Sequence, residues 1–473
     1  MQKGDIIELK VEKYAFEGKG IATLNLNNEG SSDGFVVFVN GAYPGDVISA
    51  RIVKKKKSYA EAVVENILNP SQHRTQPRCK YFGTCGGCRQ QDLSYEQQIN
   101  YKQQQVEEIF LHNASLTDFA IEVILPSEKI FYYRNKMEFS FSDKRWLTKD
   151  EINEQTKISK DFALGLHVPK VYDKILDINE CFLQSEASND ILNFTRTFFL
   201  ARKLSIYNTK VHTGYLRNLV IRQSQNTDDF MLNLVTSEPN EVLMKEYSSS
   251  ILNNFPQITT LVNNINEKKS AIAVGDYETV YHGSGFIYDK IGDYKFRISA
   301  NSFFQTNTLQ AEKLYGLALQ FAELKGDEVV YDLYSGAGTI AIYISKFAKE
   351  VYGFESVESS IFDAKENLQI NNVENVKFIQ ADLYKSFLPT LSEIPKPDVI
   401  ILDPPRSGMH KNTVADVIKL SPQKIVYVSC NPATQARDIK MMADEGYKLI
   451  KIRPVDMFPH TFHIENVALL LRS

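Results

Sequence analysis

The chain has 473 residues, of which 43% are hydrophobic and 24% charged, and its net charge at neutral pH is −4. The composition is typical of a globular protein, and the length predicts roughly two to four domains. No apolar run approaches the roughly 18 residues that a membrane-spanning helix needs, so a membrane partner is not expected.

The amino terminus and the cysteines predict a cytoplasmic location. The first residues, MQKGDIIELKVEK, carry charges throughout and lack the apolar core of a signal peptide. The five cysteines are an odd number, which argues against a disulfide framework and for reduced thiols.

Residues 1–68 are expected to form a small barrel. Five short strand-like runs separated by Gly and Asn, over 5–14, 20–25, 34–41, 46–57 and 59–68, are typical of an OB-like oligonucleotide-binding fold. Residues 51–90 contain nine Lys or Arg against two Glu, a local charge of +7. Such a run is usually a solvated face, and alone it raises the odds of nucleic-acid contact only modestly.

Residues 69–290 are expected to form a mixed α+β central domain. A polar linker at 69–78 precedes a cysteine cluster and an amphipathic helix over 94–112. Cys79, Cys85 and Cys88 stand close enough in sequence to converge on one metal centre, and Cys181 could supply a fourth ligand. Four thiols suit tetrahedral zinc or an iron–sulfur cluster, and the spacing alone does not choose between them.

Residues 291–473 alternate strands and helices, which predicts a doubly wound parallel sheet. No helix separates the last two strands, so an antiparallel pair should close the sheet. We expect seven strands, at 328–335, 350–356, 376–383, 398–405, 424–430, 447–455 and 466–472.

The turn after the first of these strands predicts a nucleotide-binding site. Gly336 lies between a strand and a helix, and Glu355 ends the next strand, where a carboxylate can bind ribose hydroxyls. A turn that needs glycine only for its geometry is the alternative. The missing third glycine of a dinucleotide fingerprint, together with Asp403 before two prolines, favours S-adenosylmethionine over NAD. Asp382 stands where a carboxylate that binds adenine is expected, whereas Asp403 could instead only cap a rigid loop.

Cys430 and Glu465 fit the chemistry of methylating carbon 5 of uracil, a poor nucleophile. A thiolate that adds to carbon 6 activates carbon 5, and a base must then remove the carbon 5 proton. Cys430 ends the fifth strand before a helix, where we expect a lowered thiol pKa, and Glu465 precedes the last strand. The alternatives are an inert core cysteine and an ordinary strand-edge Glu.

Several ordered motifs resemble the S-adenosylmethionine-dependent RNA 5-methyluridine methyltransferases. They are CGGCRQQDLSYEQQINYK, YRNKMEF, SFFQTN, DLYSGAG, DPPRSG, SCNPATQARD and DMFPHTFHIE. The resemblance implies a Rossmann-like class I methyltransferase domain at 291–473 and an N-terminal TRAM domain. It makes Cys430 the nucleophile and Glu465 the base.

The resemblance also assigns the remaining site residues. Gln305, Tyr334, Glu355 and Asp403 would line the cofactor and base site, adjoined by Gly336 and Asp382, and Phe303 would pack on the flipped uracil. The four cysteines Cys79, Cys85, Cys88 and Cys181 would hold a [4Fe-4S] cluster rather than zinc. The RNA would be 23S rRNA, with tRNA as the alternative. Neither the sequence nor the resemblance gives the oligomeric state, and a monomer is the default expectation.

Two other functions remain open at this stage. An amine-directed nucleic-acid methyltransferase would not need Cys430, although Arg406 stands where such enzymes usually have an aromatic residue. A catalytically silent RNA-binding or assembly factor would use only the barrel and the metal domain.

Overall fold

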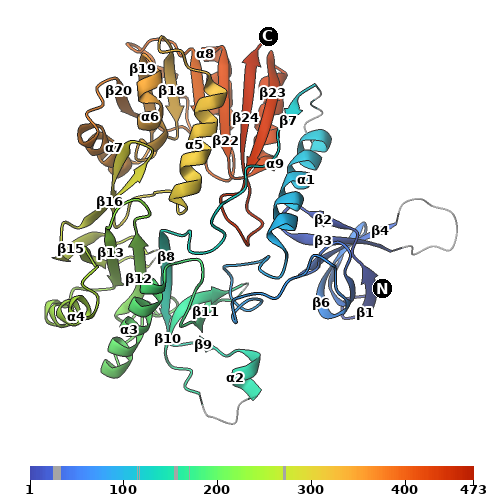
Figure 1. Ribbon diagram of the computed structural model, residues 1–473, viewed down its shortest axis with the longest axis vertical. Helices are drawn as coiled ribbons and strands as arrows, with labels where there is room; N and C mark the ends of the chain where they lie inside the picture. The colour runs from blue at the N-terminus through green and yellow to red at the C-terminus, as the bar shows by residue number, and fades with distance from the viewer. Residues whose placement is uncertain (25–33, 114–115, 117, 154–157, 170, 270–272) are drawn as a thin grey trace.

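A computed structural model describes residues 1–24, 34–113, 116, 118–153, 158–169, 171–269 and 273–473 (Figure 1). Residue 25, expected to end a strand, lies outside the described residues. In the described part of the chain, no helix is both long and apolar enough to cross a membrane.

Residues 1–24 and 34–69 form a six-stranded mixed sheet in the order β1-β5-β6-β4-β3-β2. The single strand expected over 5–14 is two strands in the structure. The amides between them bond to other segments, because the Val11 amide donates to the Asp46 carbonyl and the Glu12 amide donates to the Ile21 carbonyl. Alternating residues such as Val37 and Val39 fill the core of this sheet. The strands are β1 (Ile6–Lys10), β2 (Lys13–Ala15), β3 (Lys19–Leu24), β4 (Phe35–Asn40), β5 (Val47–Lys55) and β6 (Tyr59–Asn69).

The central domain contains an eight-stranded sheet within the described residues of 136–282, in the order β15-β14-β13-β12-β8-β10-β11-β9. One face packs on α3 and α4 through Phe139, Phe199 and Tyr247. The elements are β8 (Lys136–Ser142), β9 (Arg145–Trp146), α2 (Lys149–Asn153), β10 (Ala163–Val168), β11 (Val171–Asp177), α3 (Glu186–Arg202), β12 (Leu216–Gln223), β13 (Phe230–Thr236), α4 (Glu241–Asn254), β14 (Thr260–Ile265) and β15 (Tyr277–His282).

The third sheet has the order β20-β19-β18-β21-β22-β24-β23-β7 among the described residues. Its first five strands are parallel, and β24 runs antiparallel to both β22 and β23. The strands are β18 (Val329–Leu333), β19 (Glu350–Glu355), β20 (Val376–Gln380), β21 (Val399–Leu402), β22 (Lys424–Ser429), β23 (Tyr447–Val455) and β24 (Glu465–Arg472).

Helices cover both faces of this sheet. One core cluster packs α5 and α6 against it, and a second packs α8 and α9 against the opposite face. The remaining elements are α5 (Thr308–Ala322), α6 (Thr339–Ile344), η1 (Ser345–Phe347), α7 (Glu358–Ile370), η2 (Leu388–Leu391), α8 (Lys411–Leu420) and α9 (Pro432–Ala443).

Two expectations about this domain need correction. The sheet has an eighth strand, β7 (Ala120–Ile121), and α1 (Tyr95–Asn113) packs on the same sheet through Val106 and Phe110, although both elements were expected in the central domain. Figure 1 shows α1 and β7 beside β23. The expected boundary at 290/291 also falls inside the hairpin of β16 (Phe286–Ile291) and β17 (Tyr294–Ser299).

Candidate active site

The turn between β18 and α6 is built for close approach by a ligand. Tyr334, Gly336 and Gly338 all have positive φ angles, of 66°, 54° and 78°. A Cβ on Gly338 would lie 2.4 Å from the Phe378 ring, so packing requires that glycine. At Gly336, no described atom lies within 4 Å of the position an added Cβ would take, so this part of the turn faces open space.

Glu355 fixes this turn against the end of β19. Its Oε2 accepts a hydrogen bond from the Gly336 amide at 3.0 Å, and its Oε1 accepts from the Ser356 and Val357 amides at 2.7 and 2.8 Å. A cavity of about 250 Å³ opens beside this carboxylate. Its lining combines the expected Tyr334 and Glu355 with Pro405, one of the two prolines after Asp403, and with three residues that the sequence did not single out, Ser356, Leu383 and Tyr384. These three follow strand ends at this edge of the sheet, which is the signal that could have found them.

Asp382 lies at the same edge but is exposed. Its Oδ1 accepts from the Tyr384 amide at 3.0 Å, and its Oδ2 pairs with Lys385 at 3.2 Å. These contacts lower the pKa of Asp382, so it is a carboxylate at neutral pH. Asp382 therefore orders the turn that carries Tyr384, a cavity residue.

Buried carboxyl groups with raised pKa values lie behind the glycine turn. Burial and the charge of Asp403 raise the pKa of Asp332 well above its usual range. Asp332 Oδ2 accepts from the Ala341 amide at 3.1 Å, whereas Asp332 Oδ1 and the Ser335 hydroxyl have no hydrogen-bond partner among the described residues. After burial, Asp403 is also a cause of the raised pKa of Glu465. When they are ionised, such carboxyls favour a cationic ligand, and sequence reasoning missed Asp332.

Cys430 and Glu465 lie at neighbouring strand ends. In the β22–β24 ladder Ser429 pairs with Asn466, so the next step places Cys430 beside Glu465. The buried Gln435 of α9 ties the two strands together, because its Nε2 donates to the carbonyls of Tyr427 and Asn466 at 2.7 and 3.1 Å. The sequence prediction that the fold brings these two residues together therefore has a geometric basis.

The expected lowering of the Cys430 pKa is wrong for this structure. Burial, followed by the charges of Glu465 and Asp403, raises the pKa of the Cys430 thiol to about 12, and the charge of Arg406 opposes this with a smaller effect. Burial and Asp403 likewise raise the pKa of Glu465 well above its usual range. Both groups therefore hold their protons at neutral pH in the free protein.

The loop after β21 closes over the Cys430 turn. The Arg406 carbonyl accepts hydrogen bonds from Asn431 Nδ2 at 3.1 Å and from the Thr434 hydroxyl at 3.3 Å. The Arg406 guanidinium reaches Glu17 of the N-terminal domain at 3.7 Å. The N-terminal sheet therefore touches the loop that adjoins the candidate nucleophile.

The predicted contributors Phe303 and Gln305 lie between β17 and α5. The Gln305 carbonyl accepts from Asn135 Nδ2 at 2.8 Å, which ties the segment to the central domain. Phe303 is 70% exposed and so presents a ring that is free to stack.

Residues 456–464, which lead into Glu465 and which we call the 456–464 loop, are held by α1 and by the cysteine segment. Lys102 donates to Asp456 Oδ1 at 2.6 Å in an ion pair from which solvent is excluded, and Tyr95 donates to Asp456 Oδ2 at 2.8 Å. The carbonyl of His460 accepts from the amides of Arg89 and Gln90 at 2.8 and 3.1 Å. The position of Glu465 therefore depends on elements far from it in sequence.

Replacing Lys102 by methionine should destabilise the protein by about 3–5 kcal/mol, because it leaves the buried Asp456 charge without its cation. Urea unfolding followed by circular dichroism measures the change. Lys245→Met, which breaks an exposed ion pair with Glu241, is the matched control and should cost less than about 1 kcal/mol. Equal stability of the two variants would contradict the structural role of the buried pair.

The four remaining cysteines line one cavity of about 340 Å³. Burial raises the pKa of Cys85 to about 11 and that of Cys88 to about 12, and the neighbouring thiols contribute. The Gly87 amide and Gln91 Nε2 donate to the sulfurs of Cys85 and Cys88, both at 3.3 Å. Among the described residues no group of three or more His, Cys, Asp or Glu is arranged to hold a metal ion, so the iron–sulfur centre stays a prediction. A shared cavity with N–H···S contacts suits a bulky thiolate-bound group better than a single ion.

Comparisons with known proteins agree with this geometry. Residues 285–473 match the family model described as tRNA (Uracil-5-)-methyltransferase, and residues 1–64 match the TRAM domain. An uncharacterized RNA methyltransferase of Chlorobaculum tepidum is 41% identical, with 100% of this chain and 97% of the relative covered. A second, from Bacteroides thetaiotaomicron, is 42% identical, with 96% and 99% covered.

Among solved structures, the chain is similar to the Pyrococcus abyssi tRNA (uracil-54, C5)-methyltransferase in complex with S-adenosyl-L-homocysteine. The identity is 30%, the TM-score is 0.74, and the match covers 98% of this chain and 100% of that one. The chain therefore belongs to the RNA uracil-5-methyltransferase family, carries an N-terminal TRAM domain, and uses S-adenosylmethionine.

Proposed function

We propose that this enzyme methylates carbon 5 of a uridine by covalent catalysis, with Cys430 as nucleophile and Glu465 as base. The observation that carries the proposal is the pairing of Ser429 with Asn466, which sets the thiol and the carboxyl at the same end of adjacent strands. An amine-directed enzyme has no use for a cysteine in that place.

The proposed reaction returns Cys430 and the uracil double bond to their starting state. The Cys430 thiol releases its proton to solvent, and its sulfur adds to carbon 6, which leaves an enolate with a nucleophilic carbon 5. S-adenosylmethionine supplies the electrophilic methyl group. Glu465, after its own proton has passed to solvent, takes the carbon 5 proton, and the sulfur leaves carbon 6 as the ring double bond reforms. A carboxyl with a raised pKa is the stronger base when ionised, and this suits Glu465 to the task.

The cofactor would lie against the β18 and β19 ends. Glu355 would bind the ribose hydroxyls, Gly336 and Tyr334 would contact the ligand closely, and Leu383 and Tyr384 would pack on the adenine. Asp382 and Gln305 would lie at the margins of the site. The Asp332 oxygen that lacks a hydrogen-bond partner among the described residues, and the carboxyl of Asp403, would attract the cationic end of the ligand. Phe303, exposed on the approach, would stack on the target base.

Binding of S-adenosylmethionine should tighten by about tenfold between about pH 6 and pH 8. Burial raises the pKa of Asp403 to about 7, so raising the pH across this window creates the carboxylate that attracts the sulfonium. Isothermal titration calorimetry measures the affinity. Asp403→Asn should remove this dependence of affinity on pH, and S-adenosylhomocysteine, which lacks the sulfonium charge, should show a weaker dependence. A flat profile for S-adenosylmethionine contradicts this role of Asp403.

The RNA substrate is the finer part of the proposal. The sequence resemblance, with four cysteines and an OB-like TRAM domain, favours uridine in 23S rRNA. The similarity to the Pyrococcus abyssi enzyme, which acts on tRNA, favours tRNA as the second candidate. We take the protein to be a cytoplasmic monomer.

Methylation of unmodified rRNA and tRNA transcripts with labelled S-adenosylmethionine tests the proposal. We expect 5-methyluridine at one position of the rRNA. Label in tRNA alone would select the second candidate, and label on a base amine would contradict carbon 5 chemistry.

We also propose that Cys79, Cys85, Cys88 and Cys181 hold a [4Fe-4S] cluster with a structural role, because all four line one cavity. Protein purified without oxygen should be brown and contain about four iron and four sulfide per chain. Cys88→Ser should lose this colour and iron, whereas Cys430→Ser should keep both. Stoichiometric zinc in a colourless protein would contradict the cluster.

A further inference from the structure

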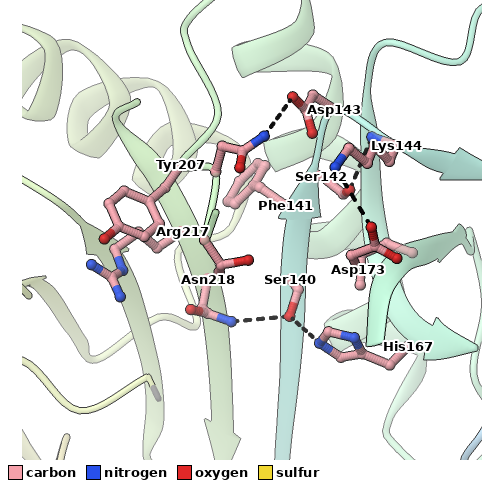
Figure 2. Close-up of a pocket in the computed structure, with 13 residues that line it drawn as sticks. Ser140, Phe141, Ser142, Asp143, Lys144, His167, Asp173, Tyr207, Arg217 and Asn218 are labelled. Atoms are coloured by element: carbon pink, nitrogen blue, oxygen red, sulfur yellow. Dashed lines mark hydrogen bonds and ion pairs between the residues drawn. The ribbon is translucent and has the colours of Figure 1, made fainter. Parts of the chain in front are cut away.

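A second pocket lies on the face of the central sheet opposite α3 and α4. On β8, Phe139 and Phe141 point into the core beneath those helices, so Ser140 and Ser142 point to the other face. Ser140 pairs directly with Asn218 of β12. These residues line a pocket of about 80 Å³, which is more than one buried water needs (Figure 2). We call it the β8 pocket.

The floor of the β8 pocket is a chain of hydrogen-bonding groups. Asn218 Nδ2 donates to the Ser140 hydroxyl at 3.1 Å, and that hydroxyl lies 3.2 Å from His167 Nε2 (Figure 2). An amide, a hydroxyl and an imidazole in one row offer both donors and acceptors. They match the edge of a ligand that itself alternates donors and acceptors.

One wall is a supported aromatic ring. The Arg217 guanidinium lies 3.9 Å from the centre of the Tyr207 ring, and it is fixed there because it donates to the carbonyls of Asn266 and Lys268 at 2.8 and 3.0 Å. The Tyr207 amide donates to the Leu216 carbonyl at 2.8 Å, which fixes the backbone as well. A ring held in this way offers a stacking surface at little entropic cost.

The charges of the opposite wall are balanced. Asp173 pairs with Lys144 at 3.6 Å and with Lys210 at 3.1 Å, and Asp143 accepts from Asn208 at 3.4 Å. A pocket with its carboxylates already engaged suits a neutral, planar ligand better than a phosphate or a metal ion.

The β8 pocket also connects to the rest of the enzyme. His167 lines both this pocket and the cysteine cavity, and its carbonyl accepts from the Gly86 amide at 3.3 Å. The cysteine segment in turn bonds to the 456–464 loop through Arg89 and Gln90. A series of hydrogen bonds therefore links the pocket to the loop before Glu465, although the pocket contributes no residue to the cavity beside Glu355.

We propose that the β8 pocket binds one unpaired base of the RNA substrate, a nucleotide other than the methylated uridine. The base stacks on Tyr207, and its edge meets Asn218, Ser140 and His167. RNA is recognised in this way when unstacked bases lie on aromatic or arginine planes and their edges are read by polar groups. The inference rests on RNA being the substrate, and it adds a recognition site remote from the chemistry.

The test measures RNA affinity and turnover separately in variants of the pocket. Tyr207→Ala should weaken binding of the transcript that serves as substrate about tenfold, which corresponds to the loss of one stacked base. It should raise KM by the same factor, while kcat stays within about twofold. Tyr207→Phe keeps the ring and should bind like the wild type, and Ser140→Ala should show an intermediate loss. Tyr277→Ala, which removes an exposed tyrosine of β15 outside the pocket, is the matched control.

Fluorescence anisotropy with S-adenosylhomocysteine present gives the affinity without turnover, and thermal unfolding shows that each variant folds. Wild-type affinity in both Tyr207→Ala and Ser140→Ala overturns the inference even where methylation proceeds. Pocket-dependent RNA binding without any 5-methyluridine would instead uphold the inference and overturn the proposed function.

Discussion

A Cys430→Ala variant should transfer no measurable methyl group from S-adenosylmethionine to RNA. Without the sulfur, carbon 5 of uracil remains a poor nucleophile, because the methyl side chain of alanine cannot add to carbon 6. Loss of a covalent nucleophile typically costs at least about 10⁴-fold in rate. Labelled methyl incorporation into the transcript measures the effect.

Cofactor binding provides the control for this variant. Cys430 does not line the cavity beside Glu355, so S-adenosylmethionine should bind Cys430→Ala with wild-type affinity. Normal affinity together with lost transfer separates chemistry from folding. Turnover near the wild-type rate would instead refute covalent catalysis by this residue and revive the amine-directed alternative.

The state of Cys430 in the free protein follows from its neighbours. With a pKa of about 12, only about one thiol in 10⁵ is ionised at pH 7. The position of Cys430 before a helix predicts a lowered pKa, whereas the pKa in the structure is raised. Asn431 is the N-cap of α9, and its own side chain accepts from the Ala433 amide, so that helix end is already engaged. Burial, and after it two carboxyls from other strands, then raise the pKa, and no local pattern in the sequence places them there.

The fold was predictable where the signal was local. Period-two and strand–helix patterns located the strands at the edge where Glu355, Asp403 and Cys430 lie. The attachment of α1 and β7 to the C-terminal sheet could not be predicted, because the sequence of an amphipathic helix does not show which apolar surface the helix packs on. The pairing of Lys102 with Asp456 is of the same kind, since 354 residues separate the partners.

The candidate site divides in the same way. The ordered family motifs identified Cys430 and Glu465. Asp332 lies inside a strand, where the sequence alone indicates only a polar residue among core residues. Its significance comes from an oxygen without a partner among the described residues and from its proximity to Asp403. Burial and unmet hydrogen bonds are properties of the packed structure, so a sequence pattern does not carry them.

Replacing Glu465 by glutamine should trap the RNA on the enzyme. Glu465 is buried and holds its proton in the free protein, so a neutral amide of the same shape should leave the fold intact. Addition of the sulfur and methyl transfer can proceed, but the carbon 5 proton cannot then be removed, and the Cys430 bond to carbon 6 persists. A band of reduced mobility containing both protein and labelled methyl should appear on a denaturing gel.

The double variant Cys430→Ala/Glu465→Gln decides whether that band is the proposed adduct. It keeps the buried amide and lacks the sulfur, so it should give no slow band and no labelled RNA. An adduct that survives in the double variant would place the covalent bond on another residue. Full turnover in Glu465→Gln without any adduct would remove Glu465 from the mechanism, and Asp403, which acts electrostatically on both groups, would become the residue to test as the base.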